Sequence, residues 1–147
     1  MRLFAVFFLI TFLGLPVIAA GQSFDDGVKA LRAGDYTNAF EFFHRLAEGG
    51  NRYAQLNLGL LYKEGKGVSA SEHKSAKWMR RSAAQGTMRA QFQVAHNYQE
   101  GYGGVQDDSK AVKWYREAAQ GGHASAQANL GLMYLNGEGV PQNYSKA

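Results

Sequence analysis

Small and apolar residues recur along this chain in a pattern that repeats every 36 positions. The run Ala-Gln-x-x-Leu-Gly-x-x-Tyr-x-x-Gly-x-Gly begins at Ala54, recurs from Ala90 with Val and Ala in place of its Leu and first Gly, and recurs in full from Ala126. In the first copy the apolar positions follow the spacing i, i+4, i+7 and i+8, which is one face of an α-helix. Repetition at this period is typical of solenoids, so we expect a stack of similar helical units.

Residues that favour helix starts recur in the same register, twice in each period. One set follows a glycine and comprises Asn51, Thr87 and His123; the other comprises Asp35, Ser71, Asp107 and Asn143. The Asn, Thr, Asp and Ser side chains can accept a hydrogen bond from a free N–H in the first helical turn, and His123 is the weak member of the series. We therefore predict two helices in each unit, beginning near residues 52, 88 and 124 and near residues 36, 72 and 108.

The pattern also predicts how the helices pack. Gly59 and Gly131 fall inside predicted helices, where Gly costs about 1 kcal/mol relative to Ala, so we expect another helix to approach closely there. Aromatic side chains at Phe42, Trp78 and Trp114 are expected to fill the space between units. The Gly-x-Gly segment after each first helix is expected to end that helix with positive backbone φ angles.

The sequence divides into a leader and successive units. Residues 1–20 combine Arg2, an apolar stretch and small residues near the end, which predicts a cleaved secretory signal peptide; an uncleaved membrane anchor is the alternative. Residues 21–50 form an atypical N-terminal unit, residues 51–86 and 87–122 form two full repeats, and residues 123–147 form an incomplete third. An atypical terminal unit is expected because one of its faces has no neighbour. We expect the mature chain to be periplasmic or extracellular, without a membrane span.

The pattern stops at Lys146-Ala147, which match Lys110-Ala111, and no counterpart of Trp114 follows. We therefore expect either a fragment of a longer protein or a second helix that is never completed. A truncated remnant without a function of its own is a further alternative.

These residues resemble the Sel-one-like repeat (SLR) family of the tetratricopeptide-repeat (TPR) superfamily. The text from Ala126 to Val140 fits the first half of the family's repeat, and the text from Lys110 to Gly122 fits most of the second half. The resemblance covers residues 24–147 and implies an all-α, right-handed α-solenoid of antiparallel helix pairs, here with about three and a half repeats. It also implies an adaptor or assembly scaffold, since exported bacterial members are linked to envelope processes, signalling and host contact.

The net charge and the cysteine count bear on which partners and which branch of the family are expected. With 16 Lys and Arg against 12 Asp and Glu the net charge is +4, which is mildly basic and does not imply nucleic acid as a partner. The chain has no cysteine, which excludes a lipoprotein anchor and makes the family's cysteine-rich, β-lactam-binding branch a poor match. Packing alone must hold this exported domain together.

No segment carries a recognisable catalytic, cofactor or metal motif. Gly65-Lys66-Gly67 fails the phosphate-loop pattern, because Leu60 stands where Gly is needed and Gly67 stands where Ser or Thr is needed. The four histidines lack metal-ligand spacing, and Asp107 is better explained as a helix cap. We therefore predict a protein that is not an enzyme and has no cofactor. The alternative is a cell-envelope enzyme or antibiotic-binding protein acting on peptidoglycan-type or β-lactam ligands.

Two surfaces remain as candidates for binding. In TPR-like stacks the first helices line a concave groove, which we expect to bind a protein or peptide. Its candidate residues vary between units: Tyr53, Leu56, Leu60 and Lys63; Arg89, Phe92, His96 and Gln99; and Ser125, Ala128, Leu132 and Leu135. The alternative is that neighbouring helices cover some of them.

The second surface is a basic outer face on the second helices. It comprises Lys74, Lys77, Arg80 and Arg81, then Lys110, Lys113 and Arg116, then Lys146. The 36-residue register places these cations on one side of the stack, where they can meet an anionic envelope surface or an acidic protein. The alternative is an ordinary solvated face.

Overall fold

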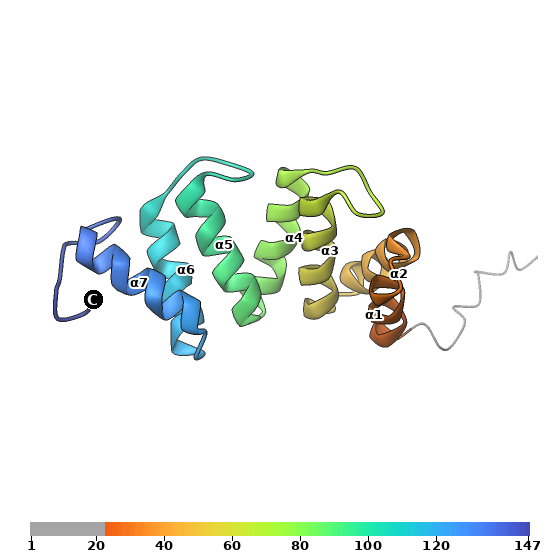
Figure 1. Ribbon diagram of the computed structural model, residues 1–147, viewed down its shortest axis with the longest axis horizontal. Helices are drawn as coiled ribbons and strands as arrows, with labels where there is room; N and C mark the ends of the chain where they lie inside the picture. Colours follow the sequence, from red (N-terminus) through yellow and green to blue (C-terminus); the bar gives the residue numbers. More distant parts are fainter. Residues whose placement is uncertain (1–22) are drawn as a thin grey trace, which may run out of the picture.

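The computed structural model describes residues 23–147, which form seven α-helices and no strand. The helices are α1 (Phe24–Arg32), α2 (Tyr36–Glu48), α3 (Arg52–Glu64), α4 (Glu72–Ala84), α5 (Met88–Glu100), α6 (Asp108–Gln120) and α7 (Ala124–Asn136). Each helix packs chiefly on the helices before and after it in the sequence, so α1 and α7 lie at opposite ends of an elongated array (Figure 1). This confirms the predicted all-α solenoid.

The predicted leader, residues 1–20, lies outside the described part of the chain. From residue 23 onwards, no helix is both long enough and apolar enough to cross a bilayer.

Side-chain caps explain why most helices begin where the sequence predicts. Asn51 accepts hydrogen bonds from the backbone N–H groups of Tyr53 and Ala54, and Ser71 and Asp107 cap α4 and α6 in the same way. His123 caps α7 through Nδ1, which accepts from the N–H of Ala126. Thr87 is the exception, since its side chain makes no capping hydrogen bond.

A large side chain of each second helix packs on a small residue of the first helix of its unit. Phe43, Met79 and Tyr115 are fully buried and occupy equivalent positions 36 residues apart. A Cβ atom added at Gly27 would lie 2.7 Å from Cε1 of Phe43, and one added at Gly59 would lie 2.8 Å from Cγ of Met79. In the next unit Tyr115 shares a buried cluster with Ala95. The close approach predicted at Gly59 is therefore confirmed.

The prediction that aromatic side chains fill the space between units holds for the two tryptophans and is wrong for Phe42. Trp78 is 5% exposed and joins the buried cluster around Phe43 of the preceding unit, and Trp114 packs against a cluster on either side of it. Phe42 is partly exposed and joins none of these clusters. Gly131 also differs from the expectation, because the atom nearest to its added Cβ is the backbone oxygen of Ala147 and not a helix.

The loop after each first helix reaches back to the preceding unit. Gly103 has φ 70°, and a Cβ atom added to it would lie 2.7 Å from the backbone oxygen of Glu72 and 2.9 Å from Cβ of Ala76. Gly67 and Gly139 make the equivalent close approach to the first turns of α2 and α6. Each Gly-x-Gly loop therefore covers the junction between two units, which places the loop from Gly101 to Asp107 over the junction of α4 and α5.

Candidate functional site

Three hollows open along helices α3 and α5. The first, of about 290 Å³, runs from Leu31 of α1 to Leu60 and Arg89. The second, of about 350 Å³, is lined by Lys63, Glu72, Ser75, His96, Asn97 and Tyr102. The third, of about 390 Å³, is lined by Arg52, Tyr53, Leu56 and the residues from Gly86 to Arg89. Arg89 borders both the first and the third hollow, so these two adjoin on one face.

Six of the candidate groove residues line these hollows: Tyr53, Leu56, Leu60, Lys63, Arg89 and His96. Tyr53, Lys63 and Arg89 are exposed, and Leu60 and His96 are partly exposed. Leu56 is only 7% exposed, because it packs in a cluster with Met79 and forms the apolar floor of its hollow. Exposed cations beside buried apolar walls suit a partner that carries both acidic and apolar side chains.

Phe92 and Gln99 are used mainly inside the array. The Phe92 ring stacks on His123 with 4.6 Å between centroids and lies 5.8 Å from the ring of Tyr115. Gln99 Oε1 accepts a hydrogen bond of 2.8 Å from the hydroxyl of Tyr115. These two side chains hold α5 against α6 and the start of α7, and they line none of the three hollows.

Leu132 and Leu135 belong to a different region from the other candidates. Both lie on α7, where they are 55% and 40% exposed, and they line none of the three hollows. Ser125 and Ala128 are also exposed on this helix.

Several cations of the basic outer face are anchored by aromatic rings of the preceding helix. The pairs recur in register: Lys74 Nζ is 5.4 Å from the centroid of Tyr62, Lys110 Nζ is 5.4 Å from that of Tyr98, and Lys146 Nζ is 5.5 Å from that of Tyr134. Arg81 lies over the Trp78 ring, and Arg116 donates to the hydroxyl of Tyr134. Cation–π attraction gives the recurring Lys residues a structural role at the helix junctions. Lys77 and Lys113 are exposed members of the same face.

The same pairing perturbs the titration of the groups involved. Lys110 Nζ lies 2.8 Å from Oδ2 of Asp107, and its hydrogen bond holds the pKa of the Asp107 carboxyl below its ordinary value. The bond in turn raises the pKa of Lys110. The hydrogen bond from Arg116 lowers the pKa of the Tyr134 hydroxyl. These shifts arise within the helix junctions and not in the hollows.

The repeated units match a known protein family. The Sel1 repeat model matches residues 19–51, 52–87, 89–123 and 124–147. The chain belongs to the Sel1 repeat family. The resemblance to Sel-one-like repeats seen in the sequence is thereby confirmed. Sel1 repeat proteins generally mediate protein–protein interactions, and the Sel1 repeat fold is typically a non-catalytic scaffold.

Solved Sel1 repeat structures are similar to this one. A Sel1 repeat protein from Oxalobacter formigenes is 32% identical with a TM-score of 0.79, over 83% of this chain and 50% of that one. A protective antigen of uropathogenic Escherichia coli strains, which displays an SLR fold, is 34% identical with a TM-score of 0.79, over 82% of this chain and 27% of that one. The chain thus spans half or less of the length of these two relatives.

A third structure shares the fold alone. Cysteine-rich protein B of Helicobacter pylori is 20% identical with a TM-score of 0.60, over 75% of this chain and 98% of that one. Among curated proteins, none matches the chain.

One residue of the second hollow departs from the Sel1 repeat pattern, and sequence reasoning missed it. Asn97 occupies the i+7 position of the repeated run, where the other two copies have Leu61 and Met133. Leu61 is 3% exposed, Met133 is 0% exposed and Asn97 is 9% exposed, so all three side chains face the interior. The signal was present in the sequence as a polar residue at a position that is otherwise apolar.

Proposed function

We propose that this chain is an exported scaffold that binds a protein or peptide partner along the face formed by α3 and α5. One observation carries the proposal. The candidate residues on the hollows, such as Tyr53, Lys63 and Arg89, stand at positions whose residue type varies between units, whereas the Ala-Gln-x-x-Leu-Gly-x-x-Tyr run recurs with little change every 36 positions. A repeat scaffold can specify a partner at positions that the packing of the helices does not fix, and hollows of this volume can accept side chains of a partner.

The side chains of this face indicate the chemistry of the partner. The linings hold four basic side chains, Arg52, Lys63, Lys66 and Arg89, against the two acidic side chains of Glu64 and Glu72. Apolar walls come from Tyr53, Leu56 and Leu60. An extended segment that presents acidic side chains between apolar ones complements such a surface.

Export is the second element of the proposal. It is supported by the order of residues 1–20, in which a basic residue, an apolar stretch and small residues follow one another. The similar Escherichia coli structure is that of a protective antigen, which agrees with a location accessible from outside the cell. We place this chain in the periplasm or outside the cell.

The test reverses charge on the proposed face and, as a matched control, on the outer face. The groove variant carries Lys63→Glu and Arg89→Glu, and the control carries Lys77→Glu and Lys113→Glu; all four residues are exposed. Each variant serves as bait in a crosslinking pull-down from the cells that secrete the protein. We expect the groove variant to lose its partner about tenfold or more and the control to retain it, because close like charges at an interface oppose binding.

The opposite outcome would assign the partner to the basic outer face and overturn the groove. Circular dichroism of both variants must match that of the unmodified protein, so that loss of binding is not loss of fold. Turnover of a β-lactam or a muropeptide by the purified protein would overturn the scaffold and favour an envelope enzyme.

A further inference from the structure

The N-terminus of α5 lacks the side-chain cap that α2, α3, α4, α6 and α7 have. Thr87 stands at the N-cap position, yet its side chain accepts no hydrogen bond from the first turn. The backbone N–H groups of Met88, Arg89 and Ala90 therefore find no acceptor among residues 23–147. In α3 the equivalent residue, Asn51, serves two such groups. The first turn of α5 thus presents three free donors.

Thr87 itself carries a hydroxyl without a partner. The residue is 7% exposed, and within the described chain its Oγ1 is the one sealed side-chain oxygen or nitrogen that makes no hydrogen bond. Leaving a buried hydroxyl unpaired destabilises a folded protein. Thr87 borders the third hollow, so an oxygen atom held there can serve the hydroxyl together with the free N–H groups beside it.

The two helices that border this hollow begin with a cation and without an acid. The second helices α4 and α6 carry Glu72 and Asp108 in their first turns, whereas α3 and α5 carry no acidic residue there. Arg52 and Arg89 occupy those turns instead, although the dipole of a helix disfavours positive charge at its N-terminus. An anion between the two helix starts removes this conflict.

The two guanidinium groups differ in how they are held. Arg52 donates to the backbone oxygen of Gln85 at 3.1 Å and lies 4.9 Å from the centroid of the Tyr53 ring, so it is fixed in place. Arg89 is exposed and forms no ion pair with any residue between 23 and 147. Arg89 is therefore available to a ligand, and Arg52 adds a fixed positive charge behind it.

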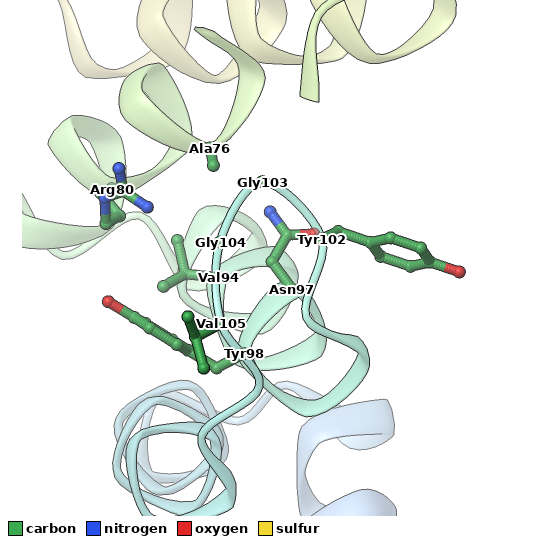
Figure 2. Close-up of a pocket in the computed structure, with 9 residues that line it drawn as sticks. All are labelled: Ala76, Arg80, Val94, Asn97, Tyr98, Tyr102, Gly103, Gly104 and Val105. Carbon is green, nitrogen blue, oxygen red and sulfur yellow. The ribbon is translucent and has the colours of Figure 1, made fainter. Parts of the chain in front are cut away.

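The other hollows suit a multiply charged anion less well. Glu64 lines the first hollow and Glu72 lines the second, whereas no Asp or Glu lines the third. The pocket at the other end of α5, under the turn at Gly103 and beside Arg80, has about 20 Å³, which is room for one water molecule (Figure 2). The third hollow is thus the one among these four whose charge and volume both admit such an anion.

A phosphate monoester matches the donors of the third hollow. Its phosphate group offers three acceptor oxygens and carries nearly two negative charges near neutral pH. Free N–H groups at a helix N-terminus and arginine guanidinium groups are both well suited to phosphate. A carboxylate has two oxygens and one charge, so it uses fewer of these donors. Tyr53 and Leu56 line the same hollow and provide an apolar wall for the group that carries the phosphate.

We propose that the third hollow binds a phosphate monoester, with its phosphate on the N–H groups of the first turn of α5 and on Arg89, and its organic group against Tyr53 and Leu56. The proposal goes beyond the proposed function, because it concerns a small ester and needs no protein partner. Phosphate in the free form shares the charged part of this chemistry and lacks the organic part.

The experiment is a titration of the purified protein at about pH 7.5, where the monoester is mostly a dianion, followed by ¹H–¹⁵N NMR. The probes are phenyl phosphate, inorganic phosphate and benzoate, all at one ionic strength. We expect phenyl phosphate to shift the backbone amide signals of Met88, Arg89 and Ala90 with a dissociation constant of about 1 mM, ordinary for a fragment of this size. Inorganic phosphate lacks the ring and benzoate lacks the second charge, so we expect each to bind about tenfold more weakly.

Two variants and a control separate binding from structure. Thr87→Asn restores the residue of the preceding unit, whose side chain caps α3. It should therefore raise the melting temperature and weaken phenyl phosphate about tenfold, because the new cap competes for the N–H groups. Arg89→Gln changes an exposed side chain and should also weaken phenyl phosphate about tenfold. Lys113→Gln removes an exposed cation of the outer face and should leave binding unchanged.

Several results would overturn the proposal. One is the absence of any shift at about 20 mM phenyl phosphate, a concentration at which a site with a dissociation constant of about 1 mM is nearly saturated. Another is inorganic phosphate or benzoate that binds as tightly as phenyl phosphate. Unchanged binding by Thr87→Asn or by Arg89→Gln, or binding that Lys113→Gln weakens equally, likewise contradicts the site. Because the titration contains no protein partner, its result stands apart from that of the pull-down.

Discussion

Helices α3 and α7 carry nearly the same sequence and have different surroundings. Both contain Ala-Gln-x-x-Leu-Gly-x-x-Tyr, but α3 lies between α2 and α4, whereas among the helices of residues 23–147 α7 packs chiefly on α6. In α3 the buried residues are Ala54, Gln55, Leu56, Leu58, Gly59, Leu61 and Tyr62; in α7 they are Ala126 and Met133. The repeated sequence therefore sets which residues a helix can bury, and the neighbouring helices determine which of them are buried.

The largest expected contrast is at the repeated leucine. Leu58 is 0% exposed and its equivalent Leu130 is partly exposed. Leu58→Ala should reduce the free energy of unfolding by about 2–5 kcal/mol, because it leaves a cavity between three helices. Leu130→Ala should cost under about 2 kcal/mol, since its surroundings already include solvent. Urea denaturation followed by circular dichroism measures both, and equal losses would contradict the contrast between α3 and α7.

The repeated glycine should respond with opposite signs. A Cβ atom at position 59 would lie 2.8 Å from Cγ of Met79 and 3.3 Å from the backbone oxygen of Ser75, so Gly59→Ala should destabilise the fold by about 1–3 kcal/mol. At position 131 the close atom is the backbone oxygen of Ala147, an exposed residue of a single turn that can shift. Gly131→Ala should therefore stabilise α7 by up to about 1 kcal/mol, the helix propensity gained. Melting temperatures that moved in the same direction would refute this difference.

The N-caps of the two helices provide a smaller test. The Asn51 side chain accepts from two backbone N–H groups, so Asn51→Ala should cost about 1 kcal/mol. The His123 cap has one bond of 3.3 Å, and its ring also stacks on Phe92, so His123→Phe keeps the stack and removes only the cap. We expect that change to cost under about 0.5 kcal/mol. Amide hydrogen exchange in the first turns of α3 and α7 checks both values.

The smallest expected effect is that of low pH on the N-caps of α4 and α6, the helices that pack on α3 and α7. Ser71 caps α4 and does not titrate, whereas Asp107 caps α6 with a pKa held low by the hydrogen bond from Lys110. The contribution of Asp107 is therefore complete above the unfolded-state pKa of about 3.9 and is lost as the pH falls through the lower folded-state pKa. Below about pH 4 we expect the first turn of α6 to lose amide protection before that of α4. Glu72 and Asp108 occupy matched first-turn positions, so their protonation does not distinguish the two helices.

Much of the architecture was predictable from residues that act locally. Helices begin one residue after Asn51, Ser71 and Asp107, because a cap needs only its own side chain and the next turn of backbone. The Gly-x-Gly loops were likewise predictable as helix ends, since positive φ is a property of the residue itself.

Features that depend on contacts between helices were predicted less well. The repeat puts Phe42 in register with Trp78 and Trp114, yet of these three only the tryptophans pack against a buried cluster within residues 23–147. The recurrence of Lys74 and Lys110 predicts a basic face, but not that their ammonium groups lie near the rings of Tyr62 and Tyr98 on the preceding helix. The sequence alone does not single out Asn97, because its neighbours in the run match the pattern; its burial beside the second hollow is visible only in the structure.

The reach of each Gly-x-Gly loop onto the preceding unit has a consequence for how such a chain can change in length. Gly103 contacts residues of α4, which belong to the preceding unit. A single unit separated at its boundaries therefore keeps only one of the two partners of each such contact. When a whole 36-residue period is duplicated or lost, each loop still meets an equivalent helix turn of the unit before it. An insertion or deletion of any other length places a loop over a turn that does not match it. A binding surface on such a stack can therefore gain or lose binding residues one unit at a time, while the contacts between the remaining helices stay the same.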